Sequence, residues 1–147
     1  MRSYPKPAVS AVIINSEKKV LLTLRSSRVL APGTWCLPGG HLEGGQDWLQ
    51  GLRQEVQEEV GLAILEPRLA GIYSDPQYNC IDEKNGDSHY FLVASFLITS
   101  FRGEVIVNEE SERFGWFSPD ALPSPMLKSE PIKIQDAVVF QGVPFVR

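Results

Sequence analysis

The sequence predicts an α/β fold in which a mixed β-sheet lies between helices. Short apolar segments separated by turn residues recur along the chain, which is typical of strands, and two longer segments have the apolar spacing of amphipathic helices. The strand-like and helix-like segments alternate along the chain. With 147 residues, 43% of them hydrophobic, the chain has the size of one globular domain, and we expect residues 1–147 to form a single domain.

The first elements expected are three strands. Residues 8–14 are rich in Val, Ile and Ala and end at a polar turn, after which residues 20–25 form a second strand. These two strands are expected to pair as a hairpin. A loop containing Pro and Gly then leads to a short strand at 34–37, which stops at the Pro-Gly-Gly sequence of residues 38–40.

The first helix is expected to begin near Trp48 and to end at Gly61. Asp47 and Gln50 have the spacing of a capping box, and glycine is the usual residue after a helix end. Glycine in a helix interior costs about 1 kcal/mol relative to alanine, so Gly51 indicates a close approach of the helix to the sheet. The residues expected to form its buried stripe are Leu49, Leu52, Val56 and Val60.

Further strands and a second helix are expected in the rest of the chain. The segments with strand-like composition are residues 69–74, 89–99, 103–107 and 114–117. Asn85-Gly86, between the first two, is a hairpin-turn signal. Residues 130–140 have helical spacing, and the side chains expected to pack on the sheet are Ile132, Ile134, Ala137, Val138 and Val139.

Charge and composition exclude several classes of protein. The 14 Lys and Arg residues are outnumbered by 18 Asp and Glu residues, giving a net charge of -4, which argues against duplex nucleic acid or an anionic membrane surface as a partner. The apolar runs are shorter than a membrane span, and the first residues lack the apolar core of a signal peptide. Cys36 and Cys80 form neither a disulfide framework nor a zinc motif, so we expect a cytoplasmic protein with reduced thiols.

Three glutamates of the first helix are the strongest functional signal. Glu55, Glu58 and Glu59 stand at i, i+3 and i+4, so their side chains share one helical face. Like charges this close repel, and a bound cation would neutralise them. The preceding Gly39-Gly40 pair allows close approach of the backbone. The segment predicts a divalent-metal site that holds a phosphate chain, with a solvated acidic helix face as the alternative.

Residues 40–62 resemble the signature of the Nudix, or MutT-like, hydrolase family. That signature runs Gly, five residues, Glu, seven residues, Arg-Glu, an apolar residue, any residue, Glu-Glu, any residue, Gly and an apolar residue. The matching residues are Gly40, Glu55, Val56, Glu58, Glu59, Gly61 and Leu62. Gln46 and Gln54 replace the family's first Glu and its Arg, which are expected to form an ion pair, and a Gln–Gln pair could replace that pair with neutral hydrogen bonds.

The resemblance implies a Nudix-type α/β/α sandwich and a Mg²⁺- or Mn²⁺-dependent attack of water on a P–O–P bond. The metal ligands it implies are Glu55, Glu58, Glu59 and the carbonyl of Gly40. Glu55 could also be the general base. A glutamate from the loop 108–112 could take that role instead, and we favour Glu112, although a solvated acidic loop is the alternative interpretation.

The residues expected to contact substrate are Arg25, Gly39, Gly40, His41 and Tyr78. Arg25 ends a strand where similar sequences often carry an Arg that meets phosphates, and its alternative role is a strand-end salt bridge. His41 could donate to a phosphate oxygen or could be an exposed loop residue. Tyr78 could stack on a base, as could Tyr73 or Phe91, but aromatic residues at such positions also serve in packing.

The resemblance implies a small nucleotide as the substrate, a nucleoside diphosphate linked to a group X. A (deoxy)nucleoside triphosphate or a nucleotide sugar is the leading expectation, with ADP-ribose or a dinucleoside polyphosphate as the alternative, because Pro76 and Tyr78 point different ways. A non-catalytic nucleotide-sensing module is an alternative of another class, supported only by Gln46 and Gln54. The acidic balance disfavours RNA 5′ ends. Similar proteins are often homodimers.

Overall fold

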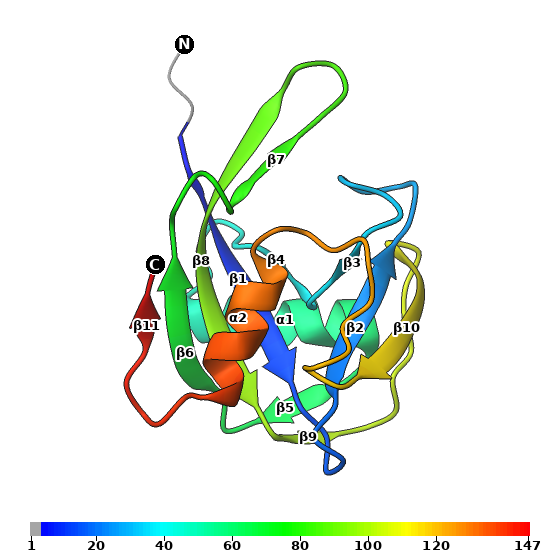
Figure 1. Ribbon diagram of the computed structural model, residues 1–147, viewed down its shortest axis with the longest axis vertical. Coiled ribbons are helices and arrows are strands. Elements are labelled where there is room, and N and C mark those ends of the chain that lie inside the picture. The colour runs from blue at the N-terminus through cyan, green and yellow to red at the C-terminus, as the bar shows by residue number, and fades with distance from the viewer. Residues whose placement is uncertain (1–3) are drawn as a thin grey trace.

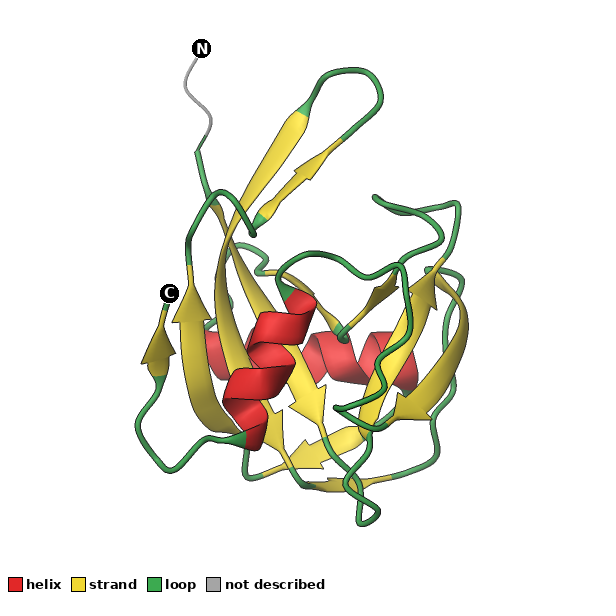
Figure 2. Cartoon of the chain, in the orientation of Figure 1, coloured by secondary structure: helices red, strands yellow, loops and turns green. Residues whose placement is uncertain are grey.

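The computed structural model describes residues 4–147 and shows a mixed sheet between two helices, which confirms the predicted α/β/α sandwich (Figures 1 and 2). In spatial order the main sheet contains β11 (Phe145–Val146), β6 (Arg68–Tyr73), β8 (Ser88–Ile98), β1 (Lys6–Ile13) and β4 (Gly39–His41). A further strand, β7 (Cys80–Asp82), pairs with β8. The sheet is mixed because β8 runs parallel to β1 whereas β6 and β4 are antiparallel to their neighbours β8 and β1.

Two smaller sheets complete the β-structure. One contains β10 (Ser111–Phe117), β2 (Val20–Arg25) and β3 (Trp35–Cys36), and the other pairs β5 (Ala63–Leu65) with β9 (Ser100–Arg102). The expected hairpin between residues 8–14 and 20–25 is therefore wrong. Strand β2 pairs with β10 along one edge and with β3 along the other. The end of the first expected strand is joined to β2 through one isolated bridge, Ile14–Val20.

The two helices cover opposite faces of the main sheet. Helix α1 (Trp48–Val60) packs on the face to which β1 contributes Val9, Ala11 and Ile13, and helix α2 (Glu130–Val138) packs on the face that receives Val12. Side chains alternate along a strand, so Ser10 shares the α2 face with Val12. Both faces of β1 are buried, which explains its nearly continuous apolar sequence.

Helix α1 has the predicted ends. The Asp47 side chain accepts a 2.8 Å hydrogen bond from the Gln50 amide, and the Gln50 side chain accepts a 2.9 Å bond from the Asp47 amide. Gly61 has the left-handed conformation, φ 71°. Gly51 does approach another element closely, but a side chain there would collide with Leu42, beyond β4, rather than with the sheet.

The buried stripe of α1 differs from the expected one at two positions, Leu49 and Gly51. Leu49 is 44% exposed, and the buried residues are Gly51, Leu52, Val56 and Val60. Helix α2 differs more. Val138 and Val139 are exposed, whereas Ile134 and Ala137 are buried together with the polar residues Glu130, Lys133 and Asp136.

The strand expected at 103–107 is also wrong. The strand in this region is β9, which ends before Gly103, where φ is 103°. Residues 104–107 lie outside named strands, and Val105 and Val107 pack against the α1 core cluster as an irregular segment. Six strands have only two or three residues, which is too short for a periodic pattern to predict: β3, β4, β5, β7, β9 and β11. Of these, β3 lies within the strand expected at 34–37, which the following Pro-Gly-Gly sequence indicated.

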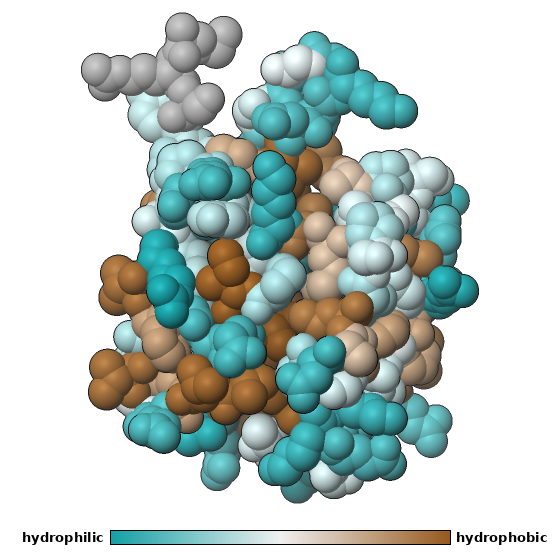
Figure 3. Space-filling model, in the orientation of Figure 1, coloured by the Kyte–Doolittle hydropathy of each residue, from teal (hydrophilic) through white to brown (hydrophobic). Residues whose placement is uncertain are grey.

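The Asn85-Gly86 signal does mark a hairpin turn. Gly86 has φ 94°, and β7 and the first residues of β8 pair antiparallel on either side of the turn. This hairpin projects beyond the rest of the sheet (Figure 1). In the space-filling view its end is hydrophilic, while hydrophobic residues gather on the middle of the face that carries α2 (Figure 3). Within residues 4–147, neither helix has the length and apolar character needed to cross a membrane.

Candidate active site

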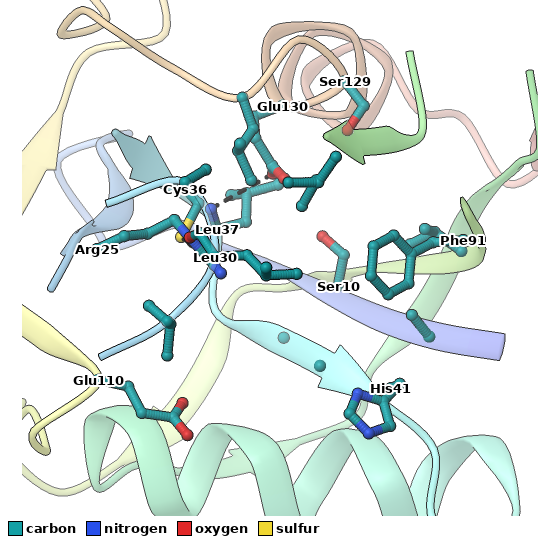
Figure 4. Close-up of a pocket in the computed structure, with 18 of the residues that line it drawn as sticks. Ser10, Arg25, Leu30, Cys36, Leu37, His41, Phe91, Glu110, Ser129 and Glu130 are labelled. Atoms are coloured by element: carbon teal, nitrogen blue, oxygen red, sulfur yellow. Dashed lines mark hydrogen bonds between the residues drawn. The ribbon is translucent and has the colours of Figure 1, made fainter. Parts of the chain in front are cut away.

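A cleft of about 1030 Å³ lies at the amino-terminal ends of the parallel strands β1 and β8. Helix α1, the β7–β8 hairpin, the loop before β10 and the start of α2 surround it. Figure 4 shows part of its lining. The cleft brings together most of the residues expected at the site: Arg25, Gly39, Gly40, His41, Glu55, Glu58, Glu59 and Tyr78.

The two glycines of β4 bring the backbone against α1. Gly39 pairs with Ser10, and a side chain at Gly39 would collide with the Val9 carbonyl. A Cβ atom on Gly40 would stand 2.7 Å from the Glu55 carboxylate. Gly39 therefore requires glycine, because the backbone of β1 occupies the space that a side chain would fill, and a side chain at Gly40 would displace the Glu55 carboxylate from its present position.

Glu59 is held directly by this strand. Its Oε2 accepts a 3.0 Å hydrogen bond from the Gly39 amide. Burial raises the pKa of Glu59 to about 8; the Gly39 bond and Arg25 oppose that rise, and the negative charges of Glu55 and Glu110 add to it. The carboxylate thus lies where its negative charge is poorly compensated.

Glu55 has the same character. Burial raises the pKa of Glu55 to about 7, and the neighbouring negative charges that raise it further are those of Glu58, Glu110 and Glu43. A pKa near neutrality lets this carboxylate accept a proton at physiological pH. Because the pKa values of both neighbouring carboxylates are raised, a bound cation would stabilise their charged forms.

The donor chemistry of this helical face fits a hard divalent cation. Mg²⁺ and Mn²⁺ prefer oxygen ligands, and this face offers the carboxylate oxygens of Glu55, Glu58 and Glu59. Because Gly40 has no side chain, nothing from that residue covers the Glu55 carboxylate. Across residues 4–147 no three acidic, His or Cys side chains are already gathered as a metal cluster. Two of the carboxylates instead accept hydrogen bonds from different groups. The Gln54 side chain donates to Glu58, and the Gly39 amide donates to Glu59.

Gln46 and Gln54 form the neutral brace that their pairing predicts. The Gln46 side-chain oxygen accepts a 2.9 Å bond from the Glu43 amide, and the Gln46 amide group donates to Gln54. Gln54 in turn donates to Glu58 over 2.9 Å. A continuous series of hydrogen bonds therefore links the loop after β4 to a carboxylate of the proposed metal face.

The loop glutamate that reaches the cleft is Glu110, whereas Glu112 does not line it. Glu112 is exposed and lies at an irregularity of β10, where the pairing register shifts between Ser111 and Arg113. This bulge turns Glu112 away from the site. Figure 4 shows the Glu110 carboxylate above α1. Of the glutamates in the predicted loop 108–112, Glu110 rather than the favoured Glu112 therefore reaches the cleft.

Arg25 lies at the cleft wall, close to the buried thiol of Cys36. Its Nη1 donates to the Cys36 sulfur over 3.6 Å, and its Nε donates to the Leu30 carbonyl. Among the described residues it makes no salt bridge, so the alternative role expected for it is not seen. Burial, partly opposed by Arg25, raises the pKa of the Cys36 thiol to about 11.

The aromatic candidates separate into two groups. Tyr78, 38% exposed, and Phe91 line the cleft, as does the exposed His41. Tyr73 lies outside the cleft lining and is a packing residue, 3% exposed, whose hydroxyl donates to Asp136 over 2.8 Å. Burial, followed by that bond and the charge of Asp136, raises the pKa of Tyr73 well above its ordinary value.

The inner end of the cleft contains polar residues that the sequence reasoning did not select. Ser10 of β1, Asn79 before β7, and Glu130 and Lys133 of α2 all line it and are all buried. The signal that could have identified two of them is the i, i+3 pair Glu130 and Lys133, which occupies helix positions that pack on the sheet.

Fold and site together define a class: an α/β/α protein in which a glycine strand is packed against helical carboxylates at the edge of a cleft. The NUDIX domain matches residues 4–138, and the chain belongs to the Nudix family. Members of this family hydrolyse nucleotide pyrophosphates, and this chain is a hydrolase of that type.

Named relatives agree with this assignment. Nucleoside triphosphatase NudI of Escherichia coli O17:K52:H18 is 28% identical over 116 residues, which are 78% of this chain and 82% of the relative. The crystal structure of a MutT NUDIX hydrolase from Burkholderia pseudomallei has a TM-score of 0.78 and 27% identity, covering 91% of this chain and 98% of that one.

A more distant structure shares the fold alone. The NUDIX domain of Shewanella oneidensis NrtR, solved in complex with ADP ribose, has a TM-score of 0.75 at 17% identity. The match covers 93% of this chain and 88% of that chain. Its ligand therefore says nothing direct about the substrate of this protein.

Proposed function

We propose that this protein is a Mg²⁺- or Mn²⁺-dependent pyrophosphohydrolase that cleaves the P–O–P bond of a nucleoside diphosphate linked to a group X. A (deoxy)nucleoside triphosphate or a nucleotide sugar is the substrate we favour. The observation that carries the proposal is the contact of Glu55 and Glu59 with the Gly39-Gly40 strand, which places two poorly compensated carboxylates at the edge of the cleft. The similarity to a nucleoside triphosphatase supports a triphosphate.

Glu55, Glu58 and Glu59 would hold the metal, together with the Gly40 carbonyl that the family pattern implies. When bound, the ion would neutralise phosphate charge and lower the pKa of water. Arg25, on the cleft wall, would contact phosphate oxygens. The attacking water would lose its proton to a carboxylate as its oxygen bonds to phosphorus, and the P–O bond to the leaving phosphate would break.

The carboxylate that accepts this proton is either Glu55 or Glu110. Glu55 lies beside Gly40 at the edge of the cleft, within the proposed metal face. Glu110 lines the cleft from the loop before β10, and it replaces Glu112 as the candidate from that loop. Glu110→Gln has a matched control in Glu112→Gln, two residues away and outside the cleft. A base at Glu110 predicts loss of turnover with retained metal affinity in Glu110→Gln, and near-normal turnover in Glu112→Gln.

A substrate panel tests the proposed reaction. Nucleoside and deoxynucleoside triphosphates, nucleotide sugars, ADP-ribose and dinucleoside polyphosphates would each be incubated with Mg²⁺ or Mn²⁺, and phosphate, pyrophosphate and nucleotide products measured. We expect turnover of at least one triphosphate or nucleotide sugar, abolished by a chelator. Efficient turnover of ADP-ribose or a dinucleoside polyphosphate alone would select the alternative that Pro76 and Tyr78 leave open.

A nucleotide-sensing module is the competing class of function. It predicts tight nucleotide binding without turnover, and its support is the loss of the family's Glu–Arg pair at Gln46 and Gln54. The hydrogen bonds that connect these two residues to Glu58 weigh against it, because the brace is intact in another chemical form.

We also propose a cytoplasmic location. Cys36 and Cys80 are both free thiols, which a reducing compartment preserves. The substrate proposed is a small anionic molecule that the local cation and metal would bind despite the net charge of -4. A homodimer stays a prediction, which sedimentation equilibrium would check.

A further inference from the structure

The loop that presents Glu110 to the cleft is tied to the end of β2 by one residue, Ser26. The Ser26 amide donates to the Glu110 carbonyl over 2.9 Å, and the Ser26 hydroxyl donates to the Glu109 carbonyl over 2.7 Å. Ser26 is 8% exposed, so water competes little for these two bonds. A single buried serine therefore holds two successive carbonyl groups of an exposed loop.

Ser26 is itself fixed by its neighbours in β2 and in the loop that follows β2. It comes directly after Arg25, which pairs with Ser111 in the register between β2 and β10. Its hydroxyl oxygen accepts a 3.3 Å bond from the Arg28 amide, which leaves the hydroxyl hydrogen for the loop before β10. Ser26 thus joins the end of β2 to the loop that carries Glu110.

Asn108 closes the same loop from its other side. The Asn108 side-chain oxygen accepts a 3.0 Å bond from the Glu110 amide, and its backbone carbonyl accepts a 3.2 Å bond from the Ser111 amide. An Asn side chain bonded to the amide two residues ahead forms an Asx turn, which fixes the direction of the chain. Both backbone polar groups of Glu110 therefore have partners, the amide at Asn108 and the carbonyl at Ser26.

The Glu110 side chain lies in the cleft opposite the α1 glutamates. It is exposed and takes part in none of the ion pairs found in residues 4–147. Its carboxylate lies above α1 (Figure 4), and its negative charge is close enough to contribute to the raised pKa values of both Glu55 and Glu59. The backbone of the loop is therefore what places this carboxylate.

We propose that Ser26 is a positioning residue, which holds the Glu110 carboxylate where it can accept the proton of the attacking water. The proposal rests on the proposed function and takes Glu110, rather than Glu55, as the proton acceptor. A base must lie within hydrogen-bond reach of the proton it removes, and a displacement of about 1 Å can cost roughly 100-fold in rate. Exposed loops are mobile, so bonds from a buried strand end restrict such displacement.

Ser26→Ala tests the positioning directly. The substitution removes the bond to the Glu109 carbonyl and keeps the amide that bonds the Glu110 carbonyl. We expect kcat to fall by roughly tenfold with KM nearly unchanged, because the lost contribution belongs to the transition state. Mn²⁺ affinity should stay at the wild-type value. A loss confined to KM or to Mn²⁺ affinity would overturn the proposal.

Thr34→Val is the matched control for the lost hydroxyl. Thr34 follows the same loop after β2, and its hydroxyl donates to the Ala31 carbonyl, also over 2.7 Å, but Thr34 does not line the cleft. Each variant removes one bond from a hydroxyl to a backbone carbonyl, so both should lower the free energy of unfolding slightly. Only Ser26→Ala should lower kcat. An equal fall of kcat in the two variants would show that Ser26 only supports the loop after β2.

A double-mutant cycle shows whether Ser26 acts through Glu110. In the Glu110→Gln background the group that Ser26 positions is already gone, so Ser26→Ala should have almost no further effect on kcat. Effects of the two substitutions that multiply would overturn the proposal. A fully active Glu110→Gln enzyme would also overturn it and would leave Glu55 as the proton acceptor.

Amide hydrogen exchange keeps this proposal separate from the proposed hydrolysis. We expect Ser26→Ala to speed the exchange of the Glu110 and Ser111 amides, which are bonded within the loop, and Thr34→Val to leave it unchanged. Faster exchange in Ser26→Ala supports the positioning of Glu110 even in a protein that hydrolyses no nucleotide. Unchanged exchange in Ser26→Ala overturns the proposal even in an active enzyme.

Discussion

The two helices that cover the main sheet carry their charges in opposite ways. Helix α1 fully buries only Gly51 and apolar residues, and its three glutamates line the cleft, Glu55 and Glu59 half-buried and Glu58 exposed. Helix α2 buries Glu130, Lys133 and Asp136 against the sheet. The α1 carboxylates can therefore be reached by a cation through the cleft, whereas Asp136 of α2 is bonded within the protein and Glu130 and Lys133 lie against each other at the cleft wall.

The largest expected effect on stability comes from α2. Asp136 is 4% exposed and accepts hydrogen bonds from Tyr73 over 2.8 Å and from Arg147 over 2.8 and 3.0 Å. Asp136→Ala leaves these donors without an acceptor and should lower the free energy of unfolding by about 3 kcal/mol. Urea denaturation would measure it, with the exposed Glu58→Gln of α1 as the comparison, expected within about 0.5 kcal/mol of wild type. Equal effects at the two sites would break the contrast between the helices.

The largest expected effect on activity comes from α1. Glu59→Gln keeps an oxygen to accept the Gly39 amide but removes the charge from the proposed metal face. Turnover should fall by roughly 100-fold or more. Glu17→Gln, in an exposed turn after β1, is the control and should retain activity. A fully active Glu59→Gln enzyme would place the chemistry elsewhere.

Substitutions at Gln46 and Gln54 should show a smaller effect, a coupling free energy between the two positions. Gln46→Glu alone puts a carboxylate beside the other glutamates, and Gln54→Arg alone replaces the donor to Glu58 with a cation. Together they would restore the family's ion pair. We expect the double variant to exceed the additive result by about 1 kcal/mol in both stability and transition-state binding, measured by a double-mutant cycle. Independent effects would mean that the two glutamines are separate changes.

The α1 carboxylates should also make the stability of the metal-free protein depend on pH. The pKa of Glu59 is raised from 4.5 to about 8 and that of Glu55 from 4.5 to about 7. Between these values the folded protein holds protons that the unfolded chain has released, so metal-free stability should fall as pH rises from about 4.5 to 8. Glu59→Gln should reduce this fall, which thermal denaturation at a series of pH values would detect. A larger fall in the variant would contradict the assigned cause.

The predictable parts of the molecule are those that local patterns determine. Asp47, Gln50 and Gly61 fix the ends of α1 through contacts within a few residues of the chain, and the spacing of Glu55, Glu58 and Glu59 follows from helical geometry alone. The sequence therefore predicts the ends of α1 and the common placement of these three glutamates, whereas the exposure of Leu49 and the contact of Gly51 with Leu42 differ from expectation.

The other parts depend on long-range packing. A bulge in β10 decides that Glu110, rather than Glu112, faces the cleft, and no local pattern predicts its register. The apolar residues of α2 allow more than one buried face, and the choice that buries Lys133 and exposes Val138 is made by the cleft and the sheet. Buried polar residues at such positions are where a local rule is expected to fail at a functional site.

The central claim is that the carboxylate face of α1 binds a divalent cation for nucleotide hydrolysis, and direct Mn²⁺ binding tests it. Electron paramagnetic resonance would count free Mn²⁺ in titrations of wild-type protein and Glu59→Gln, with and without a nucleoside triphosphate. We predict saturable binding to the wild type that is weakened at least about tenfold in Glu59→Gln. Identical Mn²⁺ binding by the two proteins, or nucleotide hydrolysis that persists in excess chelator, would contradict the account.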